Sequence, residues 1–436
     1  MGDTPVGDDS RHQAELFQQW LQFAPEPRPR DGNTYDAFIS YRSSDRTWAM
    51  ALYDALKLAG WNAFLDQYDL VPGANLEASL ANALEASSSG VIVWSSHTKD
   101  SKWCQSERNA MRNLGNRAGG FNYVFSKLDH EPLPLFAEQD LYVDFKENPE
   151  GPSGVNLLRL MCGMRGITLA PEAVVLAQRV DEDAKQAMVQ IRGAIEAGNA
   201  GTLLTMGTSD RPAMLASPGP ILAAAHGLIR LGSYEKARQV LARAGTFFPG
   251  SFRARQLEGL VLRRLGRYQD AIDVMSELKA AGHNDPETLG ILAAAWDGRY
   301  RETGKTLHLR KSRDLYLTAF QGDPMDYYTG INAASKSLFL GETDLADSLA
   351  NEVFPLVSNG GDSANMWPAC TLGEVYLLQR KIDLAAAQYQ KVVDRHPTAV
   401  GDLMGTGEQA RRICTTLELS PEETARVMAP FALLTE

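Results

Sequence analysis

The strongest constraint on the fold is an alternation of short apolar runs with helical patterns in the first third of the chain. The run at residues 90–95, Gly-Val-Ile-Val-Trp-Ser, is apolar on both faces, as a central strand must be when helices cover both sides of a parallel sheet. The alternation predicts a five-stranded parallel sheet of the flavodoxin-like α/β class. The expected strands are 35–41, 61–66, 90–95, 121–128 and 141–145, with helices over 45–59, 76–87 and 102–114.

Polar residues follow the first expected strand directly. The apolar residues 37–39 run into Ser40, Tyr41 and Arg42, and residues 43–45, Ser-Ser-Asp, then supply side chains that commonly cap helices. In open α/β sheets, ligands gather where parallel strands end in such loops. We therefore expect this loop at the edge of a binding site.

Some of these polar residues have two interpretations. Arg42 could hold a phosphate or pair with Asp45 at the surface. Asp66, at the end of the second expected strand, could orient a ribose or help to turn the chain. Ser40 fits a hydrogen-bonding residue at the strand end better than a nucleophile, because no His lies near it in sequence.

A second polar segment, Ser-Lys-Trp-Cys-Gln-Ser-Glu, occupies residues 101–107. Trp103 and Glu107 are four residues apart on an expected helix and therefore project from one face. An indole can stack on a flat ring, and a carboxylate can stabilise positive charge that develops in a transition state. The alternative is that Trp103 packs on the sheet and Glu107 is a solvated helix residue.

Three motifs in this order resemble the Toll/interleukin-1 receptor (TIR) domain family. They are the box at residues 35–45, the strand end and turn at residues 64–73, and the Ser-x-Trp-Cys-x-x-Glu segment of enzymatic members at residues 101–107. The resemblance covers residues 31–154 and implies a five-stranded parallel sheet. It also implies a "BB loop" that takes part in assembly, containing Asp69, Leu70, Pro72 and Gly73.

Enzymatic members of the family cleave NAD⁺ at the nicotinamide–ribose bond. The resemblance implies that Glu107 is catalytic, that Trp103 stacks on a ring, and that Ser40, Tyr41, Arg42 and Asp66 bind substrate. One carboxylate suffices for this chemistry because nicotinamide leaves as a cationic pyridinium and needs no general acid, unlike the leaving group of an O-glycoside.

No cofactor or metal is expected beside this site. The sequence has neither GxGxxG nor GxxxxGK[ST], and its seven His residues show no ligand spacing. NAD⁺ would therefore be a substrate and not a bound redox cofactor.

The C-terminal part of the chain repeats itself with a period of 34 residues. The blocks Leu-Gly-Ser-Tyr-Glu-Lys-Ala at 231–237 and Leu-Gly-Arg-Tyr-Gln-Asp-Ala at 265–271 make the period specific, and weaker copies lie at 340–346 and 379–385. This period is the signature of tetratricopeptide (TPR) repeats, whose paired helices stack into an all-α solenoid with a concave groove. The groove suits an unidentified partner or self-association, and a stabilising spacer is the alternative.

These patterns divide the chain into four parts. Residues 1–30 form a leader and linker, 31–154 the TIR domain, 155–217 a helical linker region, and 218–436 the repeat domain. Within the linker region we expect a helix or helical hairpin at 171–198. Residues 202–220 are expected to be a loop because proline and glycine interrupt them.

Composition limits the binding partners and the cellular compartment that we expect for the protein. A formal net charge of −11 argues against a general nucleic-acid or anionic-membrane surface. The four Cys residues have no CxxC spacing, and neither a signal peptide nor a membrane span is evident. We expect a cytoplasmic protein with reduced thiols.

Taken with the resemblance, the sequence predicts an NAD⁺ glycohydrolase of the bacterial type that releases nicotinamide with ADP-ribose or a cyclised form. The family resemblance further implies activation by self-association of TIR domains, control by the repeats, and a role in antiphage or stress defence. Two alternatives stay open. One is a non-enzymatic TIR/TPR adaptor or scaffold, and the other is an enzyme that makes a cyclic nucleotide messenger.

Overall fold

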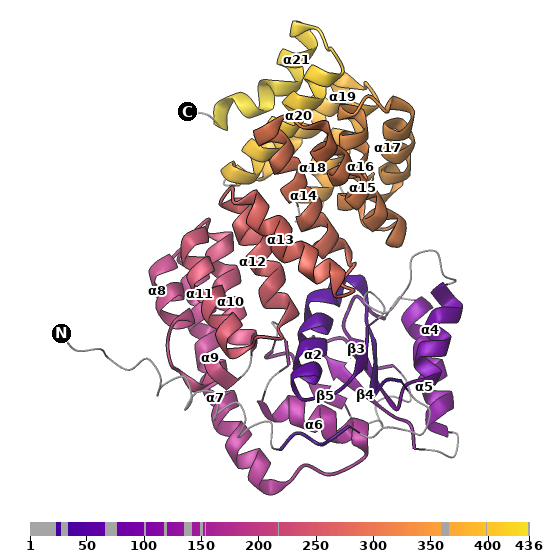
Figure 1. Ribbon diagram of the computed structural model, residues 1–436, viewed down its shortest axis with the longest axis vertical. Coiled ribbons are helices and arrows are strands. Elements are labelled where there is room, and N and C mark those ends of the chain that lie inside the picture. Colours follow the sequence, from indigo (N-terminus) through magenta and orange to yellow (C-terminus); the bar gives the residue numbers. More distant parts are fainter. Residues whose placement is uncertain are drawn as a thin grey trace, which may run out of the picture. The chain divides into compact units, whose positions relative to one another are not determined.

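The computed structural model describes residues 23–27, 34–65, 76–99, 102–116, 120–134, 142–148, 151–152, 154–216, 218–358, 366–397 and 399–434. The chain divides into two compact units, Met1–Leu265 and Gly266–Glu436. The first unit contains the sheet and the helices that follow it, and the second is helical (Figure 1).

The sheet has five parallel strands in the order β2-β1-β3-β4-β5. This confirms the expected five-stranded parallel sheet and gives it the flavodoxin-like order. The central strand β3 is buried along its whole length, as its unbroken apolar run predicts. The strands are β1 (Ala37–Ser40), β2 (Ala63–Phe64), β3 (Ser89–Trp94), β4 (Asn122–Lys127) and β5 (Tyr142–Asp144).

Helices cover both faces of the sheet (Figure 1). On one face, α4 (Leu76–Glu85) and α5 (Lys102–Asn116) enclose a core that contains Phe38, Ile92 and Phe125. The other face is covered by α2 (Arg46–Leu58) and α6 (Gly154–Arg165). Gly163 of α6 lies so close to Val124 that a Cβ there would come within 2.9 Å of a Val124 methyl. Small side chains on α6 therefore let that helix lie directly on the sheet.

The segment between the sheet and the repeats is helical. After α7 (Pro171–Glu196) come α8 (Ala200–Gly207) and α9 (Pro212–Ala216), and α10 begins at Pro218. The expected loop at 202–220 is therefore wrong. Pro212 and Pro218 each stand at the first position of a helix, where the missing N–H of proline costs nothing. The Asp183 carboxylate of α7 accepts a hydrogen bond from the Ala213 amide (2.9 Å), which fastens α9 to α7.

Paired helices then follow one another to the C-terminus. The first unit contains α10 (Pro218–Arg230), α11 (Tyr234–Phe247) and α12 (Phe252–Arg264). The second contains α13 (Tyr268–Ala280), α14 (Pro286–Thr303), α15 (Thr306–Gly322), α16 (Tyr327–Phe339), α17 (Thr343–Val357), α18 (Met366–Leu378), α19 (Ile382–Arg395), α20 (Val400–Thr416), α21 (Pro421–Met428) and the 3₁₀ segment η3 (Ala429–Leu434).

The recurring glycines mark the turn between the two helices of a repeat. Gly232, Gly266 and Gly341 have φ angles of 68°, 74° and 79°, a left-handed conformation that favours glycine. Three residues into the following helices, Ala237 and Ala271 are completely buried. The period found in the sequence is therefore the period of the helical hairpins.

None of the described helices is long and apolar enough to cross a membrane. The four cysteines, Cys104, Cys162, Cys370 and Cys414, are buried and form no disulfides. Among the described residues, no group of three His, Cys, Asp or Glu side chains could hold a metal ion.

Candidate active site

The structure brings together two of the residues singled out in the sequence, Ser40 and Glu107. Ser40, the last residue of β1, is 1% exposed, and its hydroxyl donates a 2.5 Å hydrogen bond to Oε2 of the half-buried Glu107 on α5. The two residues are 67 positions apart in the chain. This contact fixes one oxygen of the Glu107 carboxylate at the end of the first strand.

The pair lies where ligands usually bind in this class of fold. β1 lies between β2 and β3 in the sheet, so the order of strands reverses between β1 and β3. Such a reversal opens a crevice beyond the carboxyl ends of the two strands. Ser40 ends β1, and α5 follows β3, so the Ser40–Glu107 contact lies at this topological switch point.

The three-residue spacing between Cys104 and Glu107 places both side chains against the end of β1. Cys104 is 3% exposed, and its Sγ lies 3.6 Å from the backbone carbonyl of Tyr41. Glu107 follows three residues later, so both side chains occur on the same face of α5 and reach toward the end of β1. Cys104 packs the helix against the strand end while Glu107 meets Ser40. The sequence motif contains this cysteine but does not reveal which residue it packs against.

Tyr41 and Arg42 occupy different environments after β1. Tyr41 is 9% exposed, whereas Arg42 is exposed. Within the described part of the chain, no ion pair joins Arg42 to Asp45, so the surface pair considered from the sequence is wrong. Asp45 stands directly before α2, but its side chain makes no capping hydrogen bond to that helix.

Asp45 instead holds the loop that follows β3. Its carboxylate accepts a 2.6 Å hydrogen bond from the Ser95 hydroxyl, and Thr98 Oγ1 lies 3.4 Å from the same oxygen. Burial raises the pKa of Asp45, and the hydrogen bond from Ser95 partly offsets this effect. The expected capping role of Asp45 is therefore wrong because a partner 50 residues away takes the carboxylate.

A second carboxylate orders the same loop from the end of β4. Asp129 accepts hydrogen bonds from the backbone amides of Ser96 (2.7 Å) and Glu131 (2.9 Å). Partial burial acts to raise the pKa of Asp129, but these amide donors outweigh it and lower the pKa. Sequence reasoning missed Ser95, Thr98 and Asp129, whose only signal was their place just after strands β3 and β4.

Several predicted residues cannot be compared with the structure. Trp103 lies in α5 as expected, one turn before Glu107, but its side chain is outside what is described. Five further predicted residues lie outside the described residues altogether: Asp66, Asp69, Leu70, Pro72 and Gly73. Their expected roles stay predictions.

The arrangement is suited to stabilising positive charge. A carboxylate held by a neighbouring hydroxyl can face an electron-poor carbon without reorganising, which is how fixed dipoles and charges lower an activation barrier. In the described part of the site, Ser40 has no His beside it that would activate its hydroxyl as a nucleophile. The arrangement therefore suits the Glu107 carboxylate for stabilising positive charge, with the Ser40 hydroxyl holding one of its oxygens.

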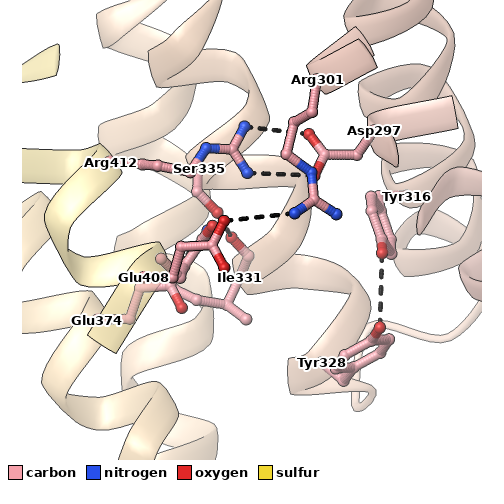
Figure 2. A network of polar contacts seen from close by, with 10 residues as sticks. Asp297, Arg301, Tyr316, Tyr328, Ile331, Ser335, Glu374, Glu408 and Arg412 are labelled. Carbon is pink, nitrogen blue, oxygen red and sulfur yellow. Dashed lines mark hydrogen bonds and ion pairs between the residues drawn. The ribbon is translucent and has the colours of Figure 1, made fainter. Parts of the chain in front are cut away.

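A network of charged residues links helices of the second unit (Figure 2). Arg412 of α20 makes two 3.1 Å hydrogen bonds to the carboxylate of Asp297 on α14. Arg301 lies 3.5 Å from Asp297 and 3.4 Å from Glu408, so it bridges the same two helices. Burial acts to raise the pKa of Asp297, but Lys336, Arg412 and Arg301 outweigh it and lower the pKa to about 2.

The network contains equal numbers of basic and acidic side chains. Its three cations are Arg301, Arg412 and Lys336, whose pKa is lowered by burial. Three carboxylates face them, namely Asp297, Glu408 and Glu374, which accepts a 3.0 Å hydrogen bond from Gln409. Burial raises the pKa of Glu374. The ion pairs of Arg412 and Arg301 with Asp297, and of Arg301 with Glu408, join α20 to α14.

Comparison with known families identifies the parts of the chain. The TIR domain family matches residues 37–159, a family described as Tetratricopeptide Repeats-Sensor matches residues 232–339, and a tetratricopeptide repeat family matches residues 371–399. The chain is thus a TIR domain followed by TPR-type repeats.

Its curated relatives share the TIR domain only. Over 75 residues, 17% of this chain, it is 37% identical to a probable 2′ cyclic ADP-D-ribose synthase of Brachypodium distachyon, of which the match covers 34%. It is 34% identical over 76 residues, also 17% of the chain, to TMV resistance protein N of Nicotiana glutinosa, and this covers 7% of that protein. Toll-like receptor 2 of Capra hircus is 33% identical over 99 residues, or 21% of this chain and 12% of the receptor. The chain therefore spans about a third or less of each of these relatives.

Solved TPR structures resemble the helical part. A thermophilic TPR protein of Thermus thermophilus has a TM-score of 0.37 at 22% identity, covering 46% of this chain and 98% of that one. MamA of Desulfovibrio magneticus has a TM-score of 0.32 at 19% identity, covering 42% and 98%.

Proposed function

We propose that the protein is an NAD⁺ glycohydrolase that cleaves the nicotinamide–ribose bond, with Glu107 as its catalytic carboxylate. The observation that carries this proposal is the 2.5 Å contact between Ser40 and Glu107 at the switch point of a TIR-domain sheet. Similarity to a protein named as a probable 2′ cyclic ADP-D-ribose synthase supports NAD⁺ as the substrate.

One carboxylate meets the needs of this reaction. The C–N bond to the ribose breaks with its electron pair leaving on nicotinamide, whose ring nitrogen thereby loses its positive charge. No proton has to be delivered to the leaving group, and positive charge develops on the ribose instead. The role of Glu107 is to stabilise that charge and to hold the ribose for the incoming nucleophile.

The product depends on which nucleophile reaches the ribose. Water gives ADP-ribose, whereas an adenine or ribose atom of the same molecule gives a cyclised form. The Brachypodium relative is named as a probable cyclic ADP-D-ribose synthase, which favours the cyclised product. Nicotinamide is released in either case, so its release tests the cleavage itself.

We further propose that TIR self-association activates the enzyme in the cytoplasm and that the repeats control this step, as part of a defence or stress response. The match to a family described as a sensor supports a regulatory role for residues 232–339. Activity should then rise more steeply than in proportion to protein concentration.

Nicotinamide release from NAD⁺ by the full-length protein tests the proposal. Glu107→Ala should abolish release, while Glu196→Ala, at the C-terminal end of α7, should release nicotinamide like the wild type. The assay is run across protein concentrations and after crosslinking into oligomers. If the crosslinked wild type releases no nicotinamide, the proposed glycohydrolase activity is ruled out and a non-enzymatic adaptor is favoured.

A further inference from the structure

The TIR domain is fastened to the first repeats by a buried carboxylate. Asp54 of α2 is 2% exposed, and its Oδ2 accepts hydrogen bonds from the Ser251 hydroxyl (3.2 Å) and the Arg253 amide (3.1 Å). Ser251 is itself the N-cap of α12. A side chain of the TIR domain thus completes the cap of a repeat helix that lies about two hundred residues further along the chain.

Apolar contacts surround this hydrogen-bonded centre. Leu58, at the C-terminal end of α2, packs against the core formed by α7, α10 and α11. A Cβ at Gly250 would lie 3.8 Å from a Leu58 methyl, so the turn before α12 also approaches α2. One face of α2 is therefore covered by the repeats of the same compact unit.

The N-terminal end of α2 lies next to the candidate site. Asp45 immediately precedes the helix and is hydrogen-bonded to Ser95 after β3, while Ser40 ends the strand before it. Asp45 and Asp54 are nine residues apart, which is about 13 Å along a helix. A continuous helix is stiff over this length, so a displacement of α2 at Asp54 is carried to the loop that contains Asp45.

Within the described part of the chain, the buried contact leaves one oxygen of the Asp54 carboxylate without a hydrogen bond. Oδ1 of Asp54 has no hydrogen-bond partner among the described residues, so the ionised carboxylate loses water that the protein replaces only in part. Burial raises the pKa of Asp54 to about 6, although the donors of α12 act to lower it. Removing one partner of such a buried contact leaves the other unpaired, so docking of α12 on α2 depends on Asp54 and on the donors of α12 together.

We propose that the Asp54 contact is a restraint through which the first repeats hold the β1–α2 loop in its resting arrangement, and that undocking α12 from α2 activates the site. This inference rests on the proposed NAD⁺ cleavage for its activity and on the geometry of α2 for its coupling. The repeats would act on the enzyme through α2, without contacting Glu107.

Hydrogen exchange tests the coupling independently of catalysis. Two amides report on the two ends of α2: that of Arg253, which donates to Asp54, and that of Asp45, which donates to the Arg42 carbonyl (2.7 Å). Asp54→Ala should accelerate exchange at both amides by about tenfold, the effect of losing a helix cap, and leave the strand β4 unchanged. Acceleration at Arg253 without acceleration at Asp45 would overturn the coupling.

Nicotinamide release tests whether undocking α12 from α2 activates the enzyme. Asp54→Ala should raise nicotinamide release at low protein concentration, and adding Glu107→Ala should remove it. Ser251→Ala keeps Asp54 but removes its hydroxyl donor and the cap bond to the Ala254 amide. It should act in the same direction and replaces Asp54→Ala if that variant does not fold. Asp347→Ala, exposed on α17, is the matched control and should change nothing.

The outcomes separate the two proposals. If both amides respond but nicotinamide release falls in the Asp54 variant, α2 docking supports the site and the restraint is wrong. If both amides respond and no variant or wild type releases nicotinamide even when crosslinked, the coupling stands and the proposed cleavage fails.

Discussion

At the scale of the residue, Ser40 makes the contact that defines the candidate site. Its place at the strand end predicted a hydrogen-bonding residue, and the family resemblance implied that it binds substrate. In the structure it is 1% exposed and its hydroxyl is occupied by Glu107. In the proposed reaction, a side chain so placed would act on the substrate through the carboxylate that it orients, so its loss should slow the chemical step more than it weakens binding.

We therefore expect Ser40→Ala to lower kcat for nicotinamide release by about tenfold or more, the effect of losing a hydrogen bond to a charged group, with little change in KM. Ser40→Thr retains the hydroxyl and should restore part of kcat. Steady-state kinetics on variants with matched thermal stability measure both parameters. A raised KM with unchanged kcat would show that Ser40 contacts the substrate instead.

Which site residues could be predicted depended on whether a local sequence pattern marks them, because their partners are distant in every case. Ser40 ends a recognisable strand pattern and Glu107 lies in a helix motif, and the structure places the two in contact although they are 67 positions apart. Asp45 was taken for a helix cap because its neighbours suggest one, whereas its partner Ser95 is 50 residues distant. Asp54 gave no signal at all, since nothing near it in sequence indicates that α12 completes its surroundings.

At the scale of the element, strand and repeat periods were predictable because burial imposes them. The unbroken apolar run of β3 and the 34-residue spacing of Gly232 and Gly266 each reflect a position that only certain residues fit. The helix α9 and the start of α10 were missed because Pro212 and Pro218 were taken as breaks. Proline is equally suited to the first turn of a helix, and only the packing around it distinguishes the two cases.

Close packing within a repeat leads to a prediction about two glycines. A Cβ at Gly373 of α18 would lie 2.6 Å from Cε1 of Tyr389, which is 1% exposed and held by the core. Gly373→Ala should therefore lower the free energy of unfolding by about 1–3 kcal/mol through overpacking. Gly405→Ala, at an exposed position in α20, should instead raise it by about 0.5–1 kcal/mol through helix propensity.

Chemical denaturation followed by circular dichroism measures both changes, and the opposite signs make each glycine variant the control for the other. Equal stability of the two variants would mean that α18 and α19 separate readily enough to admit a methyl group. That result would contradict the close packing of Gly373 against Tyr389.

At the scale of the whole molecule, the order of TIR domain and repeats was predictable, but the limits of the compact units were not. The first unit extends to Leu265 because Asp54 and Leu58 of the TIR domain pack against helices far along the chain. A second carboxylate, Asp181 of α7, accepts a 2.9 Å hydrogen bond from the Val155 amide at the start of α6. Both contacts use an Asp side chain, buried at Asp54 and half-buried at Asp181, to cap a helix from another part of the unit.

These two carboxyls predict how the stability of the first unit depends on pH. Burial raises the pKa of Asp54 and that of Asp181 to about 6, from an ordinary value of 3.8. The folded unit therefore binds more protons than the unfolded chain between these values, and the free energy of unfolding falls as pH rises through that window. Below pH 3.8 this contribution is fully present, and above pH 6 it is lost.

Lowering the pH from about 7.5 to about 5.5 should accordingly raise the free energy of unfolding by about 0.8 kcal/mol for each carboxyl. The double variant Asp54→Asn with Asp181→Asn should lose this gain, because an amide does not titrate, while Asp347→Asn at an exposed position should keep it. Denaturation at the two pH values, read from the tryptophans of the first unit, measures the difference. An equal gain in the double variant would show that other groups bind the protons and that these two aspartates are already neutral or well solvated in the native protein.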